Sequence, residues 1–106
     1  MPSEPYIPET LGRAEVDAFP GLVLLEFGTD WCGHCQGAQP RIREALASAP
    51  PLQHLKIEDG PGRPLGRSFR VKLWPTLVLL RDGVEVARVV RPQSADDVAE
   101  LFRDHF

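Results

Sequence analysis

The chain has 106 residues, enough for one hydrophobic core, so residues 1–106 are expected to form a single domain. Its apolar fraction of 42% and charged fraction of 25% are ordinary for a soluble globular protein. The net charge of −3 does not indicate nucleic-acid binding, and no apolar run approaches the ~18 residues of a membrane span. The first residues lack the basic start and apolar stretch of a signal peptide, which favours a cytoplasmic location.

The N-terminal third of the chain is expected to contribute one helix and one central strand. Tyr6-Ile7 fits a short edge strand, and residues 13–19 fit a short helix that ends before a proline and a glycine. Residues 22–27 are apolar except for Glu26, which predicts a strand that is buried on both of its faces.

Two further helices and one strand are expected in the middle of the chain. After the cysteines, apolar residues recur at helical spacing to about residue 49, and Pro40 within this stretch is expected to kink the helix. Residues 52–57 fit a second strand. Residues 65–69 fit a short helix after a loop that is rich in glycine and proline. That loop lacks the Lys-Ser or Lys-Thr pair of a phosphate-binding loop.

The C-terminal third fits a β-hairpin followed by a closing helix. Residues 77–80 are apolar, and Asp82-Gly83 is a favoured two-residue turn that joins them to a strand over residues 84–90. Ser94 and Asp97 resemble a capping box at the start of the last helix. The order of elements predicts an α/β fold with a central mixed β-sheet flanked by helices on both faces. The last helix would bury one apolar face, formed by Val98, Leu101, Phe102 and Phe106.

The chain contains only two cysteines, Cys32 and Cys35, just after the predicted central strand. A pair at the start of a helix indicates a redox site, because free N–H groups and partial positive charge at the helix terminus favour a thiolate. Cys32 would attack disulfides, and Cys35 would resolve the mixed disulfide. The alternative is a metal or cluster site shared across a dimer, although a closed zinc site needs four ligands. No metal-ligand spacing connects His34, His54 and His105, and the last two are expected at the surface without a role.

Several motifs besides the cysteines resemble those of the thioredoxin family. They are Phe27, Trp31-Cys32-Gly33-x-Cys35, Pro40, Trp74-Pro75-Thr76 and Asp82-Gly83. The resemblance extends from about residue 6 to the end of the chain, and it implies the thioredoxin fold and thiol–disulfide exchange. It also implies that Pro75 is in the cis form and faces the cysteines. The neighbours of this proline would then offer backbone groups to an extended substrate segment in a short antiparallel pair.

Glu26 lies in the predicted buried strand, where the family usually has an Asp behind the cysteines. Burial of a lone carboxylate is costly, so its pKa is expected to rise toward neutrality. Lys56 falls where the family often has a Lys near that acid. With a raised pKa, Glu26 could take the proton from Cys35 as that thiol attacks the mixed disulfide. The alternative is a plain, solvated ion pair between Glu26 and Lys56.

The residues between the cysteines depart from the Gly-Pro pair of reductive thioredoxins, and Gly33-His34 instead resembles protein disulfide isomerase. A histidine here can favour the Cys32 thiolate as a charge and as a hydrogen-bond donor. Stabilising the reduced form makes the couple more oxidising. Upstream, Gly28-Thr29 replaces residues that are commonly aromatic and small in the family, which would leave the floor of the site less filled.

Two further departures fall where the family binds substrates. Trp74 replaces a usual aliphatic residue, and its ring is expected to line the docking groove or to pack beside Trp31. Arg91 falls where the family usually has a glycine, and it would add bulk and charge at the rim of the groove. The candidate substrate-binding residues are Trp31, Trp74, Pro75, Thr76 and Arg91.

The sequence therefore predicts a thioredoxin-fold oxidoreductase that exchanges a Cys32–Cys35 disulfide or dithiol with protein substrates. It is expected to need no bound cofactor or metal ion and to act as a monomer, with neither nucleic acid nor membrane as a partner. The resemblance implies a thioredoxin reductase as a further partner, and Arg91 would narrow the choice of such partners. The alternative function is a binding module that keeps the fold and the groove, with incidental redox activity.

Overall fold

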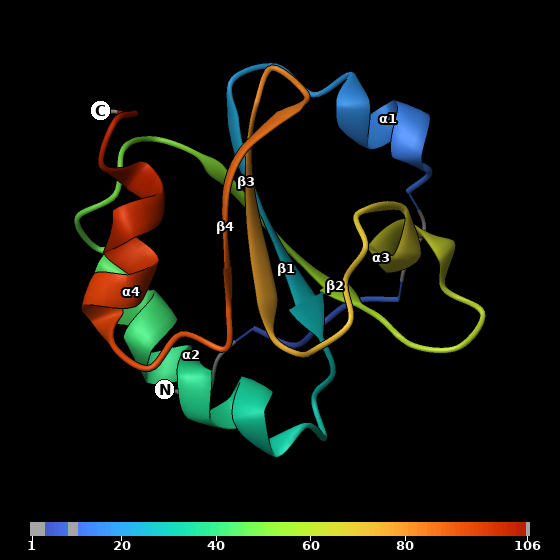
Figure 1. The fold of residues 1–106 in the computed structure, drawn as a ribbon, viewed down its shortest axis with the longest axis horizontal. Coiled ribbons are helices and arrows are strands. Elements are labelled where there is room, and N and C mark those ends of the chain that lie inside the picture. The colour runs from blue at the N-terminus through green and yellow to red at the C-terminus, as the bar shows by residue number, and fades with distance from the viewer. Residues whose placement is uncertain (1–3, 9–10, 106) are drawn as a thin grey trace.

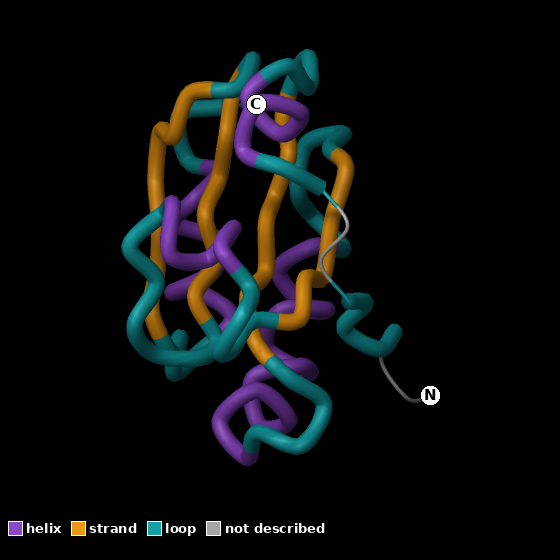
Figure 2. Tube along the Cα trace, turned by 90° about the vertical axis from the view of Figure 1, so that its right-hand side faces the viewer, coloured by secondary structure: helices purple, strands orange, loops and turns teal. Residues whose placement is uncertain are grey.

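The computed structural model describes residues 4–8 and 11–105. In chain order the elements are α1 (Arg13–Asp17), β1 (Leu22–Gly28), α2 (Gly33–Leu46), β2 (Gln53–Glu58), α3 (Pro64–Ser68), β3 (Thr76–Arg81), β4 (Val84–Val90), α4 (Ala95–Ala99) and the 3-10 turn η1 (Glu100–Phe102). The strands form one sheet in the order β2-β1-β3-β4 and lie side by side in Figure 2. Strand β1 is parallel to β2 and antiparallel to β3, and β4 is antiparallel to β3, which confirms the predicted mixed sheet.

Helices cover both faces of the sheet, with α2 and α4 on one face and α1 and α3 on the other (Figure 1). Because successive side chains of a strand point to opposite faces, β1 contributes to two cores. Val23, Leu25 and Phe27 pack in the core under α1 and α3, whereas Leu24 packs in the core under α2 and α4. The predicted burial of this strand on both faces is confirmed.

Both α1 and α2 end earlier than predicted, at Asp17 and Leu46. After each helix, backbone N–H groups donate to carbonyls three residues back, so the chain leaves the helix through a tight turn. The proline after Ala49 also disfavours a helical conformation at Ala49 itself. Pro40 lies inside α2, which continues through it, and the expected kink stays a prediction.

The N-terminal segment reaches the outer edge of the sheet, as expected for Tyr6-Ile7. Its pairing is a single parallel bridge between Ile7 and Ile57 of β2. The N–H of Ile7 donates to the carbonyl of Lys56 at 3.0 Å, and the N–H of Glu58 donates to the carbonyl of Ile7 at 2.7 Å. This bridge holds the neighbouring Tyr6 over the end of β1, where its side chain is buried.

The predicted hairpin and closing helix are also present. Asp82 and Gly83 have φ of 50° and 83°, the left-handed backbone that a two-residue hairpin turn requires. The closing helix is α4 followed by η1, and Val98, Leu101 and Phe102 are buried as predicted. Phe106 lies outside the described residues.

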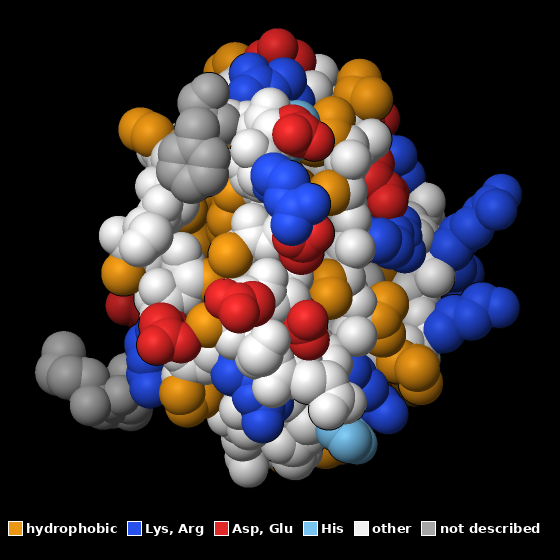
Figure 3. Space-filling view, turned by 60° about the vertical axis from the view of Figure 1, so that its left-hand side comes forward, with side chains coloured by type: hydrophobic (Ala, Val, Ile, Leu, Met, Phe, Trp, Pro, Cys, Tyr) orange, Lys and Arg blue, Asp and Glu red, His pale blue; other side chains and the backbone are white. Residues whose placement is uncertain are grey.

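The surface carries charges of both signs. Acidic and basic side chains are interspersed on the face that includes α4 (Figure 3), and no continuous basic area covers that face. Within the described ranges, none of the helices is long and apolar enough to cross a membrane.

Candidate active site

Cys32 and Cys35 lie at the beginning of α2, directly after the end of β1. Cys32 is the N-cap residue of the helix, and its Sγ accepts a hydrogen bond from the N–H of Cys35 at 3.2 Å. Cys32 retains 8% of its surface exposed, whereas Cys35 is completely buried, and both are free thiols. The two cysteines are therefore unequal in the way that their order on the helix predicts.

The surroundings of Cys35 oppose its ionisation. Burial, and then the hydrogen bond and negative charge that Cys32 presents, raise the pKa of the Cys35 thiol to about 12. A thiol of this kind keeps its proton near neutral pH and is a poor nucleophile until that proton is removed.

The floor of the site is filled by an aromatic ring that the sequence comparison of Gly28-Thr29 did not anticipate. A Cβ added at Gly28 would lie 2.6 Å from Cys35 Sγ and 2.9 Å from the hydroxyl of Tyr6. Glycine at this position lets the thiol and the tyrosine approach each other. Tyr6, Cys32 and Cys35 form a small buried cluster, against which Trp74 packs. The expectation of a less filled floor is therefore wrong.

Glu26 lies on β1 and is completely buried within a hydrogen-bonded network. Its Oε1 accepts from His54 Nε2 at 2.8 Å, and its Oε2 accepts from Gln39 Nε2 at 2.9 Å and from the hydroxyl of Tyr6. The carboxylate is therefore satisfied by three donors, from the N-terminal segment, α2 and β2.

The predicted direction of the Glu26 pKa is wrong. Burial acts to raise it, but hydrogen bonds from His54, Gln39 and Tyr6, together with the charge of His54, outweigh burial and hold the pKa below its ordinary value. The prediction considered desolvation alone, whereas hydrogen bonds to the charged form favour ionisation. The buried Glu26 is therefore a carboxylate near neutral pH.

Lys56 lies beside this network but reaches Glu26 only through Gln39. Its Nζ donates to Gln39 Oε1 at 2.8 Å and to the backbone carbonyl of Glu4. The side chain that contacts the Glu26 carboxylate directly from β2 is His54, so the plain Glu26–Lys56 pair is not formed. Lys56 also lies 4.6 Å from the centre of the Tyr6 ring, where a cation is attracted by the ring face.

The substrate-binding candidates gather around Trp74, which packs against the cluster of Tyr6, Cys32 and Cys35. The Trp74-Pro75 peptide bond is cis, as the family resemblance implied. Of the two positions expected for the Trp74 ring, the structure shows packing beside Trp31, with ring centres 5.7 Å apart in an edge-to-face arrangement. The indole N–H of Trp74 donates to Asp59 at 2.8 Å, which fixes the ring. Pro75 and Thr76 are buried.

Arg91 has a φ of 50°, the left-handed backbone that glycine adopts most easily, which explains why a glycine is usual at this position. Its side chain lies along the substrate-binding candidates, and its Nε donates to the carbonyl of Trp74 at 2.8 Å. Its backbone N–H donates to the carbonyl of Pro75 at 2.9 Å. Arg91 is thus joined directly to the cis-proline loop.

Trp31, Gly33 and His34 are the exposed residues of the motif. Trp31 leaves 75% of its surface accessible, and Gly33 and His34 are exposed in the first turn of α2. In the described part of the chain, no group of three or more His, Cys, Asp or Glu side chains is placed to hold a metal ion.

Sequence reasoning missed Tyr6, Gln39 and His54. A signal for His54 was present, because His54 and Lys56 are two residues apart on one strand and so point to the same face of the sheet. The register pairs Lys56 with Glu26, so His54 had to lie near the same carboxylate. Tyr6 and Gln39 carried no such signal, because their positions depend on the N-terminal segment and on the rotation of α2.

A mixed sheet between two layers of helices, with a Cys-x-x-Cys pair at a helix N-terminus beside a cis-proline, defines a thiol–disulfide exchange protein. The family described as Thioredoxin matches residues 12–104. Thioredoxin from Chlamydia trachomatis is 36% identical over 86 residues, covering 80% of this chain and 83% of that protein. Protein disulfide-isomerase A2 from Pongo abelii is 38% identical over 100 residues, covering 89% of this chain but 19% of that protein.

Solved structures agree with this assignment. The reduced form of thioredoxin 2 from Pseudomonas aeruginosa PAO1 is 61% identical and has a TM-score of 0.84, covering 93% of this chain and 92% of that chain. A thioredoxin mutant from Halobacterium salinarum is 32% identical, with a TM-score of 0.72 and coverage of 99% and 96%. The chain belongs to the thioredoxin family. It is a protein-disulfide oxidoreductase, as the sequence predicted.

Proposed function

We propose that Cys32 is the attacking thiol and Cys35 the resolving thiol in exchange with protein disulfides. The observation that carries this assignment is the contrast between Cys32 at the cap of α2 and Cys35, which is buried with a pKa of about 12. The partial positive charge of the helix N-terminus favours a thiolate at Cys32. A buried, protonated thiol does not reach an external disulfide, but Cys35 is close enough to attack a disulfide formed on Cys32.

In the first step the Cys32 thiolate attacks one sulfur of the substrate disulfide, and the other substrate sulfur leaves as a thiolate. In the second step Cys35 loses its proton and attacks Cys32 Sγ. The bond between Cys32 and the substrate breaks, and the substrate leaves with two reduced sulfurs. The protein is left with the Cys32–Cys35 disulfide, so two electrons have passed to the substrate.

Glu26 is proposed as the proton acceptor for the second step. It is ionised in its hydrogen-bonded network, which is the state that a base requires. It is also a weak base for a thiol with a pKa of about 12, so a stable protonated Glu26 does not form in the resting dithiol. Two of the causes that raise the pKa of Cys35 come from the Cys32 thiol and are lost in the mixed disulfide. Proton transfer is therefore proposed to accompany the attack, and Lys56 supports the network through Gln39.

Trp31, Trp74, Pro75 and Thr76 are proposed to form the platform for the substrate. The exposed ring of Trp31 and the fixed ring of Trp74 offer an apolar surface beside Cys32. The backbone next to Pro75 would pair with an extended substrate segment. Arg91 already donates to the carbonyl of Trp74, so a substrate that uses this carbonyl must share it with Arg91 or displace the side chain.

His34 is proposed to make the couple more oxidising than a proline at this position would. As an exposed residue of the first turn of α2, it adds a donor and a partial charge near Cys32. We also propose that the protein acts as a monomer in the cytoplasm and is reduced by a thioredoxin reductase. The use of its only two cysteines for exchange is typical of a reducing compartment.

The thiol roles are tested by trapping. Cys35→Ser should leave substrate proteins covalently bound to Cys32, because the mixed disulfide can no longer be resolved. Mass spectrometry of these adducts identifies the substrates and the attached cysteine. Cys32→Ser is the matched control and should give no adducts. Adducts on Cys35 in that control would contradict the assignment.

A further inference from the structure

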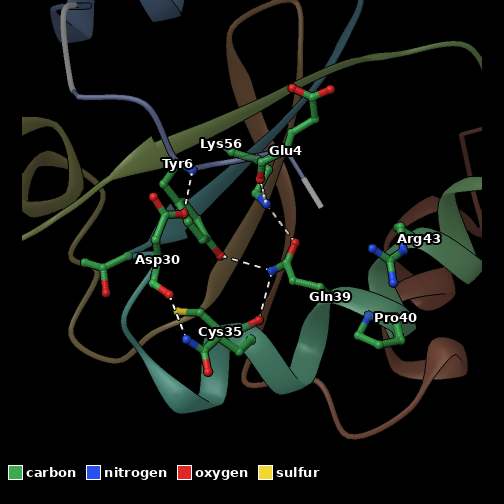
Figure 4. Close-up of a pocket in the computed structure, with 10 residues that line it drawn as sticks. Glu4, Tyr6, Asp30, Cys35, Gln39, Pro40, Arg43 and Lys56 are labelled. Carbon is green, nitrogen blue, oxygen red and sulfur yellow. Dashed lines mark hydrogen bonds between the residues drawn. The ribbon is translucent and has the colours of Figure 1, made fainter. Parts of the chain in front are cut away.

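The hydroxyl of Tyr6 lies where the exchange site and the buried carboxylate meet. It donates to Glu26 Oε2, and it lies with Cys35 Sγ around Gly28 in one buried cluster. Gln39 Nε2 lies 3.4 Å from the same hydroxyl. Figure 4 shows the side chain of Tyr6 pointing from the N-terminal segment toward α2, with its hydroxyl between Cys35 and Gln39.

Within the described residues, the hydrogen bonds of the Glu26 carboxylate go to Tyr6, Gln39 and His54, and none goes to Cys35. Gln39 also donates to the backbone carbonyl of Cys35, not to its sulfur. Among the described residues, Tyr6 hydrogen-bonds the carboxylate and shares a buried cluster with the resolving thiol.

The position of Tyr6 is held from several sides. Its backbone N–H donates to Asp30 at 3.0 Å, and the bridge at Ile7 ties the segment to β2. The groups that face its side chain are Glu26 from β1, Cys35 and Gln39 from α2, and Lys56 from β2, whose ammonium lies over the ring. Gly28 provides the space, because any Cβ there would collide with the tyrosine or the thiol.

We propose that the hydroxyl of Tyr6 conducts the proton from Cys35 to Glu26 during resolution of the mixed disulfide. The Cys35 S–H donates its proton to the phenolic oxygen, while the phenolic proton passes to Glu26 Oε2. The tyrosine is neutral before and after the step, Glu26 gains one proton, and the Cys35 thiolate attacks Cys32 Sγ. This inference rests on the proposed roles of the two cysteines and of Glu26.

A neutral relay also suits the charges around Tyr6. Burial and the negative charge of Glu26 raise the pKa of Tyr6, so a free tyrosinate is strongly disfavoured. A concerted transfer never forms that anion. Tyr6, Cys35, Gln39 and Lys56 are among the residues that line a pocket of about 330 Å³ (Figure 4).

The test uses Tyr6→Phe, which removes the hydroxyl and keeps the ring. Stopped-flow mixing of the reduced protein with an excess of a symmetric aromatic disulfide releases one coloured thiolate on attack by Cys32 and a second on resolution by Cys35. We expect Tyr6→Phe to leave the first phase within about twofold of wild type and to slow the second by roughly a hundredfold, the range of general acid–base catalysis. The solvent deuterium effect on the second phase should also fall.

Ser68→Ala is the matched control, because it removes a hydroxyl bonded to the carbonyl of Leu65, away from the site. Both phases should then match wild type. The double variant Tyr6→Phe/Glu26→Gln should be no slower in the second phase than the slower of the two single variants. Both changes interrupt the same route of proton transfer. A second phase at the wild-type rate in Tyr6→Phe, or fully additive losses, would overturn the proposal. If the wild-type protein showed no first phase, the proposed roles of the two cysteines would be wrong, whatever the role of Tyr6.

Tyr6 is the only tyrosine of the chain, which allows a test that does not depend on the folding of Tyr6→Phe. Protein produced with fluorinated tyrosine carries the change in hydroxyl acidity at this position alone. The second phase should change by about twofold or more, with the first phase unchanged. An unchanged second phase would show that the hydroxyl carries no proton.

Discussion

The two sides of the exchange site, one helical turn apart, differ in almost every physical property. Next to Cys32 in the chain is the exposed Trp31, whose ring meets that of Trp74 at the cis-proline loop, where the side chain of Arg91 also binds. On the Cys35 side lie buried Tyr6 and Glu26. The first side offers apolar and backbone groups to a partner, and the second offers donors and acceptors for a proton. On the roles proposed above, docking and proton transfer therefore use different parts of one site.

The largest expected effect is on the reactivity of the two cysteines, which separates one side of the site from the other. Cys32→Ser should abolish reduction of a protein disulfide. In wild type near pH 7, Cys32 should be alkylated more than about a hundredfold faster than Cys35, because reactivity follows the thiolate and the pKa of Cys35 is about 12. Mass spectrometry of timed samples measures both rates. Equal alkylation of the two thiols would remove the distinction between the two sides.

The second expected effect is on the stability of the fold and comes from the charge of the buried Glu26. The direction of its pH dependence follows from the direction of the pKa shift. The pKa of Glu26 is lower in the folded protein than the value of about 4.3 in an unfolded chain. The ionised network therefore adds stability above that unfolded value and loses it as pH falls through the folded pKa. Glu26→Gln should lower the free energy of unfolding at pH 7 by roughly 1–3 kcal/mol, since donors of the network lose their charged acceptor.

Denaturant unfolding at several pH values measures this effect. The gap between wild type and Glu26→Gln should narrow as the pH falls below 4, where the wild-type carboxyl also takes up a proton. Glu85→Gln is a useful control, because its carboxylate pairs with Arg88 at the surface and its loss should cost less. A more stable Glu26→Gln at pH 7 would mean that desolvation outweighs the hydrogen bonds at this site.

The third expected effect is on the reduction potential of the cysteine pair, through His34 on the exposed side of the site. His34→Pro should make the couple more reducing, because it removes a donor and a partial charge near Cys32. One favourable contact of about 1.4 kcal/mol corresponds to about 30 mV for a two-electron couple. A redox titration against glutathione measures the shift, with the stability of the fold followed in parallel. No shift, or a shift to a more oxidising potential, would exclude His34 as the residue that tunes the couple.

The smallest expected effect is on the docking of protein substrates, with no change in the chemistry of the cysteines. Arg91→Gly frees the carbonyl of Trp74, and glycine suits the φ of 50° at this position. We expect kcat/KM for protein disulfides to change by several-fold, less than about 1.4 kcal/mol, and the rate with a small aromatic disulfide to stay the same. If both substrates respond equally, Arg91 acts on the cysteines and not on docking.

Much of the site could be predicted from the sequence because its signals are local. The cap position of Cys32 follows from a strand that runs into a cysteine pair and a helix, and the hairpin follows from Asp82-Gly83. The network around Glu26 could not be predicted in the same way. Its donors come from residues 13 to 28 positions away along the chain, and whether a buried carboxylate is ionised depends on all of them together.

The sequence by itself determined the α/β order of elements, the buried strand of residues 22–27 and the unequal positions of the two cysteines, because these depend on periodicity and on helix ends. Only the tertiary structure decided that Glu26 is paired with His54 rather than Lys56, that its pKa is lowered, and that Tyr6 donates to it from the same buried cluster as Cys35. The physical reason is that a buried polar group is governed by the donors that the fold brings within about 3 Å of it. Those donors lie on three separate segments, and their convergence exists only in the folded chain.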